Sequence, residues 1–519
     1  MNIFKSLITL VVLALCSLSL QAQENKHKSH GGHEAKSHHG HKAKGHHGHA
    51  AKSQDGRMPV TTSSPKALEL YYQGLAMMDQ SRPVAARPFF DQALELDPQF
   101  AMALHRKRGT AGTFVEGREI QAQLLEQLKT ATLSEGETIF FGAMAKARGG
   151  DMPGYLADLE KLVHMYPKDH RLLMQYAGYF YNRDKPKALK LFAKVAEMEP
   201  EFPPVYNVLG YCYKDTGDKT KAEEAFRKSI KLDPNSPNGY DSLAELLLSM
   251  GRYQESIAQY DKALEVEPLF PSAQIGVASN LCLLGDYHAA RERLNKLFDI
   301  APHDGIRSGI HWALSVTYAD QGDFKGALTE LDKNFQISKK NNDVTAMRVD
   351  LFNQATVLLA AGRPDDAAKA CKEAIELVRG DEKAPARNKA FSEALYTWWE
   401  GRIAAEQNNL HKAADKLTAF FEAVEALNAP NFKKSGYDLR GTIQLKSEQY
   451  AEALESFKQG NEHDPIVMYY TGLAYQGLGQ HKQANKMFDY VINANSPLSY
   501  SFSFARRLAA KSKKGHHGS

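Results

Sequence analysis

Residues 203–234, PPVYNVLGYCYKDTGDKTKAEEAFRKSIKLDP, decide how this chain folds. Tyr206 and Gly210 lie in one apolar run, Ala222 and Phe226 lie in a second, and a proline closes the stretch. Small Gly and Ala let two antiparallel helices approach, bulky Tyr and Phe fill the space between them, and proline ends the second helix. Prolines recur every 34 residues, at Pro200, Pro234, Pro268 and Pro302. This period predicts a tandem array of helix pairs.

The quoted stretch resembles a tetratricopeptide repeat, whose pattern is an aromatic residue, Leu-Gly, Tyr, then Ala and Phe four apart, then Pro. Here these letters are Tyr206, Leu209, Gly210, Tyr213, Ala222, Phe226 and Pro234. Four more copies are marked by Gly74, Ala86, Phe90 and Pro98; by Tyr179, Ala188, Phe192 and Pro200; by Gly441, Ala453, Phe457 and Pro465; and by Gly472, Tyr475, Ala484 and Phe488. The resemblance implies an all-α superhelix, an α-solenoid, of about twelve helix pairs with a C-terminal capping helix.

The organisation along the chain follows from the strength of this pattern. Weaker copies carry Ala327, Ala367 and Ala413, which stand 40 and 46 residues apart, so longer helices or connections are expected there. No stretch from 65 to 512 alternates with period two, which argues against a sheet. We predict a signal peptide at 1–22, a disordered His/Lys/Gly-rich segment at 23–64, an N-terminal repeat array at 65–304, divergent longer pairs at 305–433, a C-terminal repeat pair at 434–497, a capping helix at 498–512 and a basic, His-containing tail at 513–519.

The first 22 residues have the features of an export signal. Lys5 precedes an apolar run from Leu7 to Leu20, and Leu20-Gln21-Ala22 fits a signal-peptidase site. We therefore expect an exported, periplasmic protein, with secretion or a lipid anchor on Cys16 as alternatives. Leu15, directly before Cys16, argues against the anchor because bacterial lipoprotein signals carry Gly, Ala or Ser at that position. No later apolar run is long enough to span a bilayer, although peripheral association with the envelope stays open.

Residues 24–54 are rich in histidine and contain almost nothing that could be buried. This composition predicts disorder, because apolar burial could not offset the cost in chain entropy. The clustered imidazoles suit Cu(II), Ni(II) or Zn(II), but no carboxylate or thiol set fixes a geometry, so a solvated tether is the alternative. The candidate ligands are His27, His30, His33, His38, His39, His41, His46, His47 and His49.

Other features argue against catalysis and nucleic-acid binding. Phosphate-loop, dinucleotide-binding and nucleophile-elbow motifs are missing, so we predict a chain that is not an enzyme and requires no cofactor. The formal net charge is +4, but basic residues are concentrated near both ends and the body is mildly acidic. Such a body without a basic stripe does not favour nucleic acid as a partner.

The resemblance implies that a protein or peptide partner would lie on the concave face, at positions two, five, nine, twelve and thirteen of each first helix. The carboxylate-binding clamp known in some members is absent, because Asn207 and Tyr211 occupy its Lys and Asn positions. Simple exposure is the alternative for all these residues, and packing between helices for Trp398. The residues at these positions are Tyr71, His170, Tyr181, Asn207, Tyr211, Lys214, Asp241, Glu245 and Trp398.

Two functions are compatible with these features. The first is a non-enzymatic scaffold or adaptor of the cell envelope, which binds a partner on the concave face. The alternative is a metal-binding protein, in which the His-rich tail collects copper, nickel or zinc and the array docks a partner.

Overall fold

The computed structural model describes residues 56–382 and 384–515. This part contains 25 α-helices and no strand, which confirms the predicted all-α solenoid. Twenty-four of the helices form twelve successive pairs, and one helix follows them. Among the described residues, no helix is both long enough and apolar enough to cross a membrane. The predicted signal peptide and the nine candidate metal-binding histidines lie outside the described residues.

The described residues divide into two compact units. The N-terminal unit comprises residues 56–110 and 118–201, and the C-terminal unit comprises 111–117 and 202–515. The N-terminal unit contains four successive helix pairs. In the second, the first helix is short and continues as a 3₁₀ turn, η1 (Arg108–Thr110), and the two helices do not pack closely against each other. The pairs are α2 (Pro65–Asp79) with α3 (Pro83–Leu96), α4 (Ala101–Lys107) with α5 (Phe114–Gln127), α6 (Glu135–Gly149) with α7 (Met152–Met165), and α8 (His170–Phe180) with α9 (Lys185–Met198).

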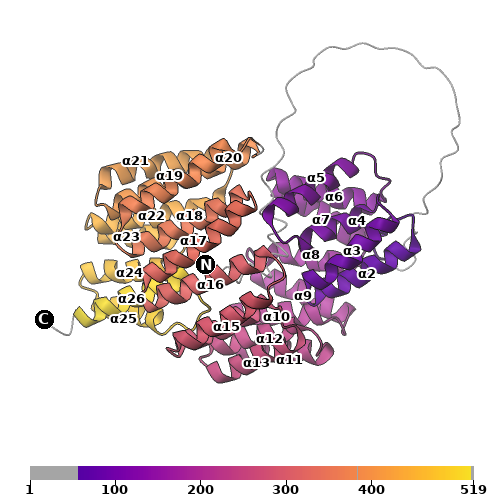
Figure 1. Ribbon diagram of the computed structural model, residues 1–519, viewed down its shortest axis with the longest axis horizontal. Helices are drawn as coiled ribbons and strands as arrows, with labels where there is room; N and C mark the ends of the chain where they lie inside the picture. Colours follow the sequence, from indigo (N-terminus) through magenta and orange to yellow (C-terminus); the bar gives the residue numbers. More distant parts are fainter. Residues whose placement is uncertain (1–55, 383, 516–519) are drawn as a thin grey trace, which may run out of the picture. The chain divides into compact units, whose positions relative to one another are not determined.

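The C-terminal unit contains eight pairs and the last helix (Figure 1). Helices α16 to α21 have 17 to 21 residues, against 13 or 14 in the three pairs before them. The bounds are α10 (Pro203–Asp215), α11 (Lys219–Leu232), α12 (Pro237–Ser249), α13 (Tyr253–Val266), α14 (Pro271–Leu283), α15 (Tyr287–Ile300), α16 (Asp304–Gln321), α17 (Phe324–Lys340), α18 (Val344–Ala360), α19 (Pro364–Gly380), α20 (Ala386–Glu406), α21 (Leu410–Ala426), η2 (Pro430–Phe432), α22 (Lys433–Lys446), α23 (Tyr450–Gln459), α24 (Pro465–Gly477), α25 (His481–Ile492) and α26 (Tyr500–Gly515).

Four pairs close by the packing of glycine against phenylalanine that the sequence pattern predicts, at Gly74–Phe90, Gly210–Phe226, Gly441–Phe457 and Gly472–Phe488. Phe226 of α11 is fully buried against Gly210 of α10, where an added Cβ would lie 2.5 Å from the ring. Between the two helices Gly217 adopts φ of +88°, which favours glycine, and Asp218 caps α11 by accepting a hydrogen bond from Lys221 N at 3.0 Å. The turn and the interlocking ring together hold α10 and α11 antiparallel.

The segment 56–64 corrects one predicted boundary. We placed it in the disordered region 23–64, but it runs along the N-terminal unit as a docked segment. Met58 is only 8% exposed. The backbone N–H groups of Met58, Thr61 and Ser63 donate to the carboxylates of Asp169, Glu137 and Asp97 at 3.1, 2.9 and 2.7 Å. Charge-assisted bonds of this kind order an extended segment that has little apolar surface of its own.

Helix α26 starts and ends two to three residues later than predicted, and it does more than cap the stack. One side buries Ala505 and Ala509 against the last pair, α24 and α25. The other side packs Tyr500 and Phe504 into the core that contains Trp312 of α16. Helix α26 therefore joins the last pair of the C-terminal unit to its fourth pair, beside which it is drawn in Figure 1.

Candidate functional site

The repeat of 34 residues aligns side chains on the first helices of the C-terminal unit. Tyr211 of α10, Glu245 of α12 and Ser279 of α14 occupy the same register position. The Tyr211 hydroxyl donates to Glu245 Oε2 at 3.0 Å, so these register neighbours touch. We call this surface of α10, α12, α14 and α16 the inner face.

Three of the predicted partner-binding residues form one cluster on the inner face. The Tyr211 hydroxyl also contacts Ser242 Oγ at 3.2 Å, and the Lys214 ammonium forms an ion pair with Glu245. Lys214 Nζ lies 5.3 Å from the centre of the Tyr211 ring, which adds a cation–π contact. The side chains of Lys214 and Glu245 are 20% and 15% exposed, so the cluster is accessible but largely desolvated.

Asp241 lies near this cluster, and Asn207 occupies the equivalent register position on α10. A carboxylate oxygen of Asp241 and the amide oxygen of Asn207 are buried without a hydrogen-bond partner among the described residues. Burial, and then the neighbouring charge of Glu245, raise the pKa of Asp241 well above its usual value. Burial also raises the pKa of Tyr211, with further contributions from Glu245 and Asp241. Asp241 and Glu245 thus lie close enough for their charges to interact, and a cationic group bound beside them would favour the ionised form of Asp241.

On α14 and α16 the inner face is already occupied by the chain itself. The backbone N–H of Leu498 donates to Ser279 Oγ at 3.0 Å, and Arg506 forms an ion pair with Asp320 at 3.2 Å. The Tyr500 hydroxyl bonds to Ser315, and its ring lies edge-on to Trp312 at 6.2 Å. At Ser279, the segment that leads into α26 therefore contacts the register position that remains half-buried at Tyr211 on α10 and Glu245 on α12.

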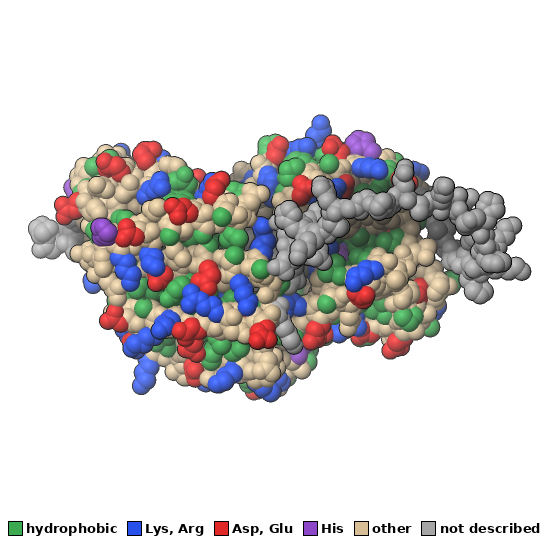
Figure 2. Space-filling model, turned by 90° about the horizontal axis from the view of Figure 1, so that it is seen from above, with side chains coloured by type: hydrophobic (Ala, Val, Ile, Leu, Met, Phe, Trp, Pro, Cys, Tyr) green, Lys and Arg blue, Asp and Glu red, His purple; other side chains and the backbone are tan. Residues whose placement is uncertain are grey.

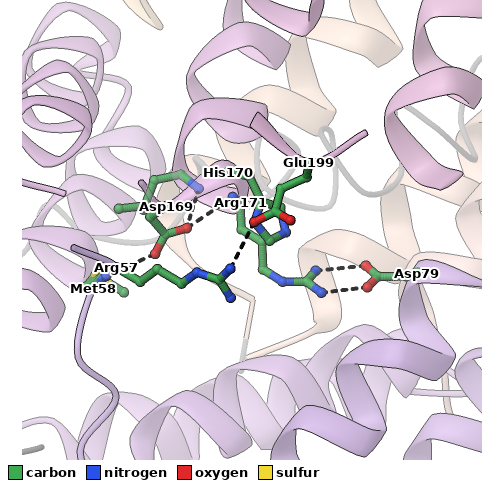
Figure 3. Close-up of polar contacts among 8 residues, drawn as sticks. Arg57, Met58, Asp79, Asp169, His170, Arg171 and Glu199 are labelled. Atoms are coloured by element: carbon green, nitrogen blue, oxygen red, sulfur yellow. Dashed lines mark hydrogen bonds and ion pairs between the residues drawn. The ribbon is translucent and has the colours of Figure 1, made fainter. Parts of the chain in front are cut away.

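His170 lies in a separate polar cluster in the N-terminal unit (Figure 3). Its Nδ1 atom is 3.3 Å from Glu199 Oε1, which also accepts a bond from Arg57 at 2.9 Å. Burial and the charge of Arg171 lower the pKa of His170, which favours its neutral form. Asp169 caps α8 and accepts the N–H of Met58. These contacts hold segment 56–64 against the helices, so His170 is part of an internal clamp.

The other predicted residues do not join the inner-face cluster. Tyr71 is 2% exposed and packs against Phe100 with ring centres 5.2 Å apart, so its expected display on an accessible face is wrong. Asn207 and His170 are also buried, at 2% and 8%. Tyr181 is the half-buried residue after α8, and the Trp398 ring donates to the Ser435 carbonyl at 2.9 Å, which fits the packing alternative.

Sequence reasoning missed Ser242 and the contacts of the C-terminal segment. Counting 34 residues on from Glu245 would have identified Ser279 as the equivalent residue of the next repeat. The contact between Ser279 and Leu498 could not be predicted, because no local sequence pattern connects them. Among the described residues, no group of three or more His, Cys, Asp or Glu side chains could hold a metal ion. The metal prediction falls on residues 27–49, outside the described part, and stays a prediction.

Comparison with known families gives repeat matches. Tetratricopeptide-repeat models match residues 203–236, 225–258, 242–305 and 467–496. Residues 279–386 match the family described as anaphase-promoting complex subunit 5. No catalytic family is indicated. No curated protein is similar enough to be matched to the chain.

Among solved structures, the chain is similar to a tetratricopeptide repeat protein from Parabacteroides merdae ATCC 43184, with 17% identity and a TM-score of 0.35. That match covers 48% of this chain and 94% of the other. The chain is also similar to MamA, with 21% identity and a TM-score of 0.26, over 32% of this chain and 96% of MamA.

Proposed function

Because the chain is built from tetratricopeptide repeats, we propose that it is a non-enzymatic scaffold that binds a protein partner on the inner face of α10 and α12. The partner segment we envisage carries at least one Lys or Arg side chain. That side chain would lie against Asp241 and Glu245.

The main support for this proposal is that a segment of the chain itself, around Leu498 and Arg506, already binds to the inner face of α14 and α16. On α14, the Ser279 hydroxyl accepts a hydrogen bond from the backbone N–H of Leu498. On α16, the Asp320 carboxylate accepts one from the Arg506 guanidinium. On α10 and α12, the equivalent surface presents carboxyl groups and an unpaired, buried oxygen on Asp241. Buried polar atoms without partners cost free energy, so a ligand that supplies donors at this place gains affinity.

Figure 2 shows acidic and basic side chains interspersed over the visible face, with apolar side chains between them. On the inner face, we expect Asp241, Glu245 and the contacts around them to select a basic partner. A role in the cell envelope rests on the predicted export signal at 1–22.

A peptide array tests the proposal. We expect the purified chain to retain peptides enriched in Lys and Arg, and we expect an Asp241→Asn, Glu245→Gln double variant to lose most of them. Glu224→Gln, an exposed change on α11, is the matched control and should bind like the unchanged chain. Circular dichroism would verify that all three chains fold alike. Equal binding by the double variant would exclude the acidic inner face as the docking surface.

A further inference from the structure

Aromatic side chains of α18 and α20 form one stacked cluster in the C-terminal unit. The rings of Phe352 and Trp399 lie nearly parallel, at 9°, with their centres 5.5 Å apart. Trp398 lies edge-on to Trp399, with ring centres 5.3 Å apart. Phe352 and Trp399 are buried in the same core cluster. These rings therefore hold the first helices of two successive pairs together.

Two arginines lie against this aromatic cluster. Arg348 Cζ is 6.0 Å from the centre of the Phe352 ring. Arg402 Cζ is 5.5 Å from the centre of the Trp398 ring and 5.6 Å from that of Trp399. These distances are within the range of a cation–π contact. Contacts with the rings thus position both guanidinium groups, one at each ring of the stacked pair.

The cluster follows the register of the inner face. Arg402 stands four residues before the last residue of α20, as Tyr211 does in α10 and Glu245 in α12. Phe352 and Trp398 each stand eight residues before the last residue of their own helix. The register therefore places these side chains on the side of α18 and α20 that corresponds to the inner face.

The two arginines have hydrogen-bond donors that the protein does not use. A cation–π contact stabilises the charge of a guanidinium but leaves its five N–H donors unpaired. Within residues 56–382 and 384–515, neither Arg348 nor Arg402 donates a side-chain hydrogen bond or forms an ion pair. Burial lowers the pKa of Arg348, and no carboxylate opposes this effect. Both residues are half-buried, and their nitrogen atoms are not fully enclosed, so a ligand can reach these donors.

Carboxyl groups near Arg402 have other partners. The charge of Arg402 reaches Asp438 of α22, but both oxygens of that carboxyl group accept hydrogen bonds from Asn461. Glu406, one turn after Arg402 on α20, forms an ion pair with the Lys446 ammonium at 3.0 Å. The described part of the chain therefore supplies no carboxylate oxygen to the Arg402 guanidinium.

We infer that Arg348 and Arg402 form a docking surface for an acidic segment of a partner protein, with one Asp or Glu side chain for each arginine. A guanidinium matches the paired oxygens of a carboxylate. The two arginines contact different rings, which suits two carboxylates along a chain better than one phosphate group. Packing against the rings orients the guanidinium groups before the partner binds, which reduces the entropy lost on binding. The surface lies on other helices than Asp241 and Glu245 and has the opposite charge, so it does not depend on the proposed function.

Binding of a labelled Glu-rich peptide to the full chain tests this inference. We expect saturable binding in fluorescence anisotropy at constant ionic strength, and no binding of the same peptide with every Glu replaced by Gln. The inference would be overturned if the Glu-rich peptide showed no saturable binding at millimolar concentration, or if the Gln peptide bound equally well. Displacement of the peptide by inorganic phosphate at constant ionic strength would identify a phosphate ligand and would also overturn it.

Variants locate the binding. Arg402→Gln and Arg348→Gln should each weaken binding of the peptide at least about tenfold, because a charge-assisted bond is lost. Lys412→Gln, at an exposed position of α21, removes the same charge elsewhere and should bind unchanged. The Asp241→Asn, Glu245→Gln double variant should also bind unchanged, which separates this surface from the one proposed on α10 and α12.

Thermal unfolding of each variant shows whether it keeps the fold, and the two arginine positions give two separate tests. Undiminished binding in both arginine variants, or an equal loss in Lys412→Gln, would show that the acidic peptide binds elsewhere.

Discussion

Arg171 of α8 and Asp79 of α2 form an ion pair with two hydrogen bonds, although 92 residues separate them in the sequence. The two N–O distances are 2.8 and 2.6 Å. Burial opposes the charge of Arg171, but its bond to Asp79 and the Asp79 charge outweigh this and raise its pKa. Since α2 and α8 belong to the first and fourth pairs of the N-terminal unit, this contact ties distant pairs together.

A double-mutant cycle measures how much this ion pair stabilises the N-terminal unit. We expect a coupling energy of about 1–2 kcal/mol between Asp79→Asn and Arg171→Gln in denaturant unfolding, because the geometry is bidentate and both side chains are at least two-thirds buried. Lys66 and Glu69, which pair at 2.8 Å on the surface of α2 with 60% and 55% exposure, provide the control cycle. That cycle should give no more than about 0.5 kcal/mol. Similar coupling in both cycles would contradict the expected role.

The packing of glycine against phenylalanine within the regular repeats can be tested at Gly210. Gly210→Ala places a methyl group 2.5 Å from the Phe226 ring, so we expect a loss of about 1–3 kcal/mol in the free energy of unfolding. Gly142→Ala in α6 is the matched control. An added Cβ there has nothing within 4 Å, and helix propensity should make the variant about 0.5–1 kcal/mol more stable. A Gly210 variant as stable as the control would show that the two helices can separate without cost.

This same contact explains why so much of the fold could be predicted. The residues that close a pair, such as Gly210 and Phe226, lie within one repeat, so their spacing is visible as a local pattern. Contacts between distant repeats leave no such pattern: Arg506 and Asp320 are 186 residues apart. The register also gives Tyr211 and Glu245 equivalent positions in successive repeats, and in the structure they form a hydrogen bond. It could not tell that Tyr71 is buried, because exposure depends on the neighbouring Phe100 and on side-chain size.

Asp350 of α18 should make stability depend on pH. Its carboxyl group accepts bonds from Asn334 Nδ2 at 2.8 Å and Ser338 Oγ at 2.6 Å, yet burial raises its pKa from 3.8 to about 7. The unfolded chain releases this proton near pH 4 and the folded chain near pH 7. The stability contributed by the protonated group is therefore full below pH 4 and is lost as the pH rises through about 7.

Asp350→Asn removes this ionisation while keeping the size of the side chain. We expect the variant to gain about 2–3 kcal/mol relative to the unchanged chain between pH 5 and pH 8, measured by denaturant unfolding at both values. Asp332→Asn, at an exposed position of α17, serves as the control and should show no such change with pH. A constant difference between Asp350→Asn and the unchanged chain would mean that Asp350 is already ionised in the folded state at pH 5.

Removal of α26 tests what this helix stabilises. It could cover only the last pair, or it could also connect the last pair to α16 within the C-terminal unit. A chain ending at Pro497 would expose Tyr469 and Phe488 on the last pair and Trp312 on α16. Full burial of each large side chain contributes about 1.5–3 kcal/mol, so we expect a loss of several kcal/mol and self-association on gel filtration.

Arg506→Gln and Asp320→Asn then separate the two roles, since Asp320 belongs to α16 and not to the last pair. If α26 ties the unit together, each change should reduce the free energy of unfolding by about 0.5–2 kcal/mol, and the double variant should lose less than the sum. A chain ending at Gly515 is the control for the truncation, because it keeps all of α26. Additive losses, or a truncated chain as stable as this control, would leave α26 as a cover for the last pair alone.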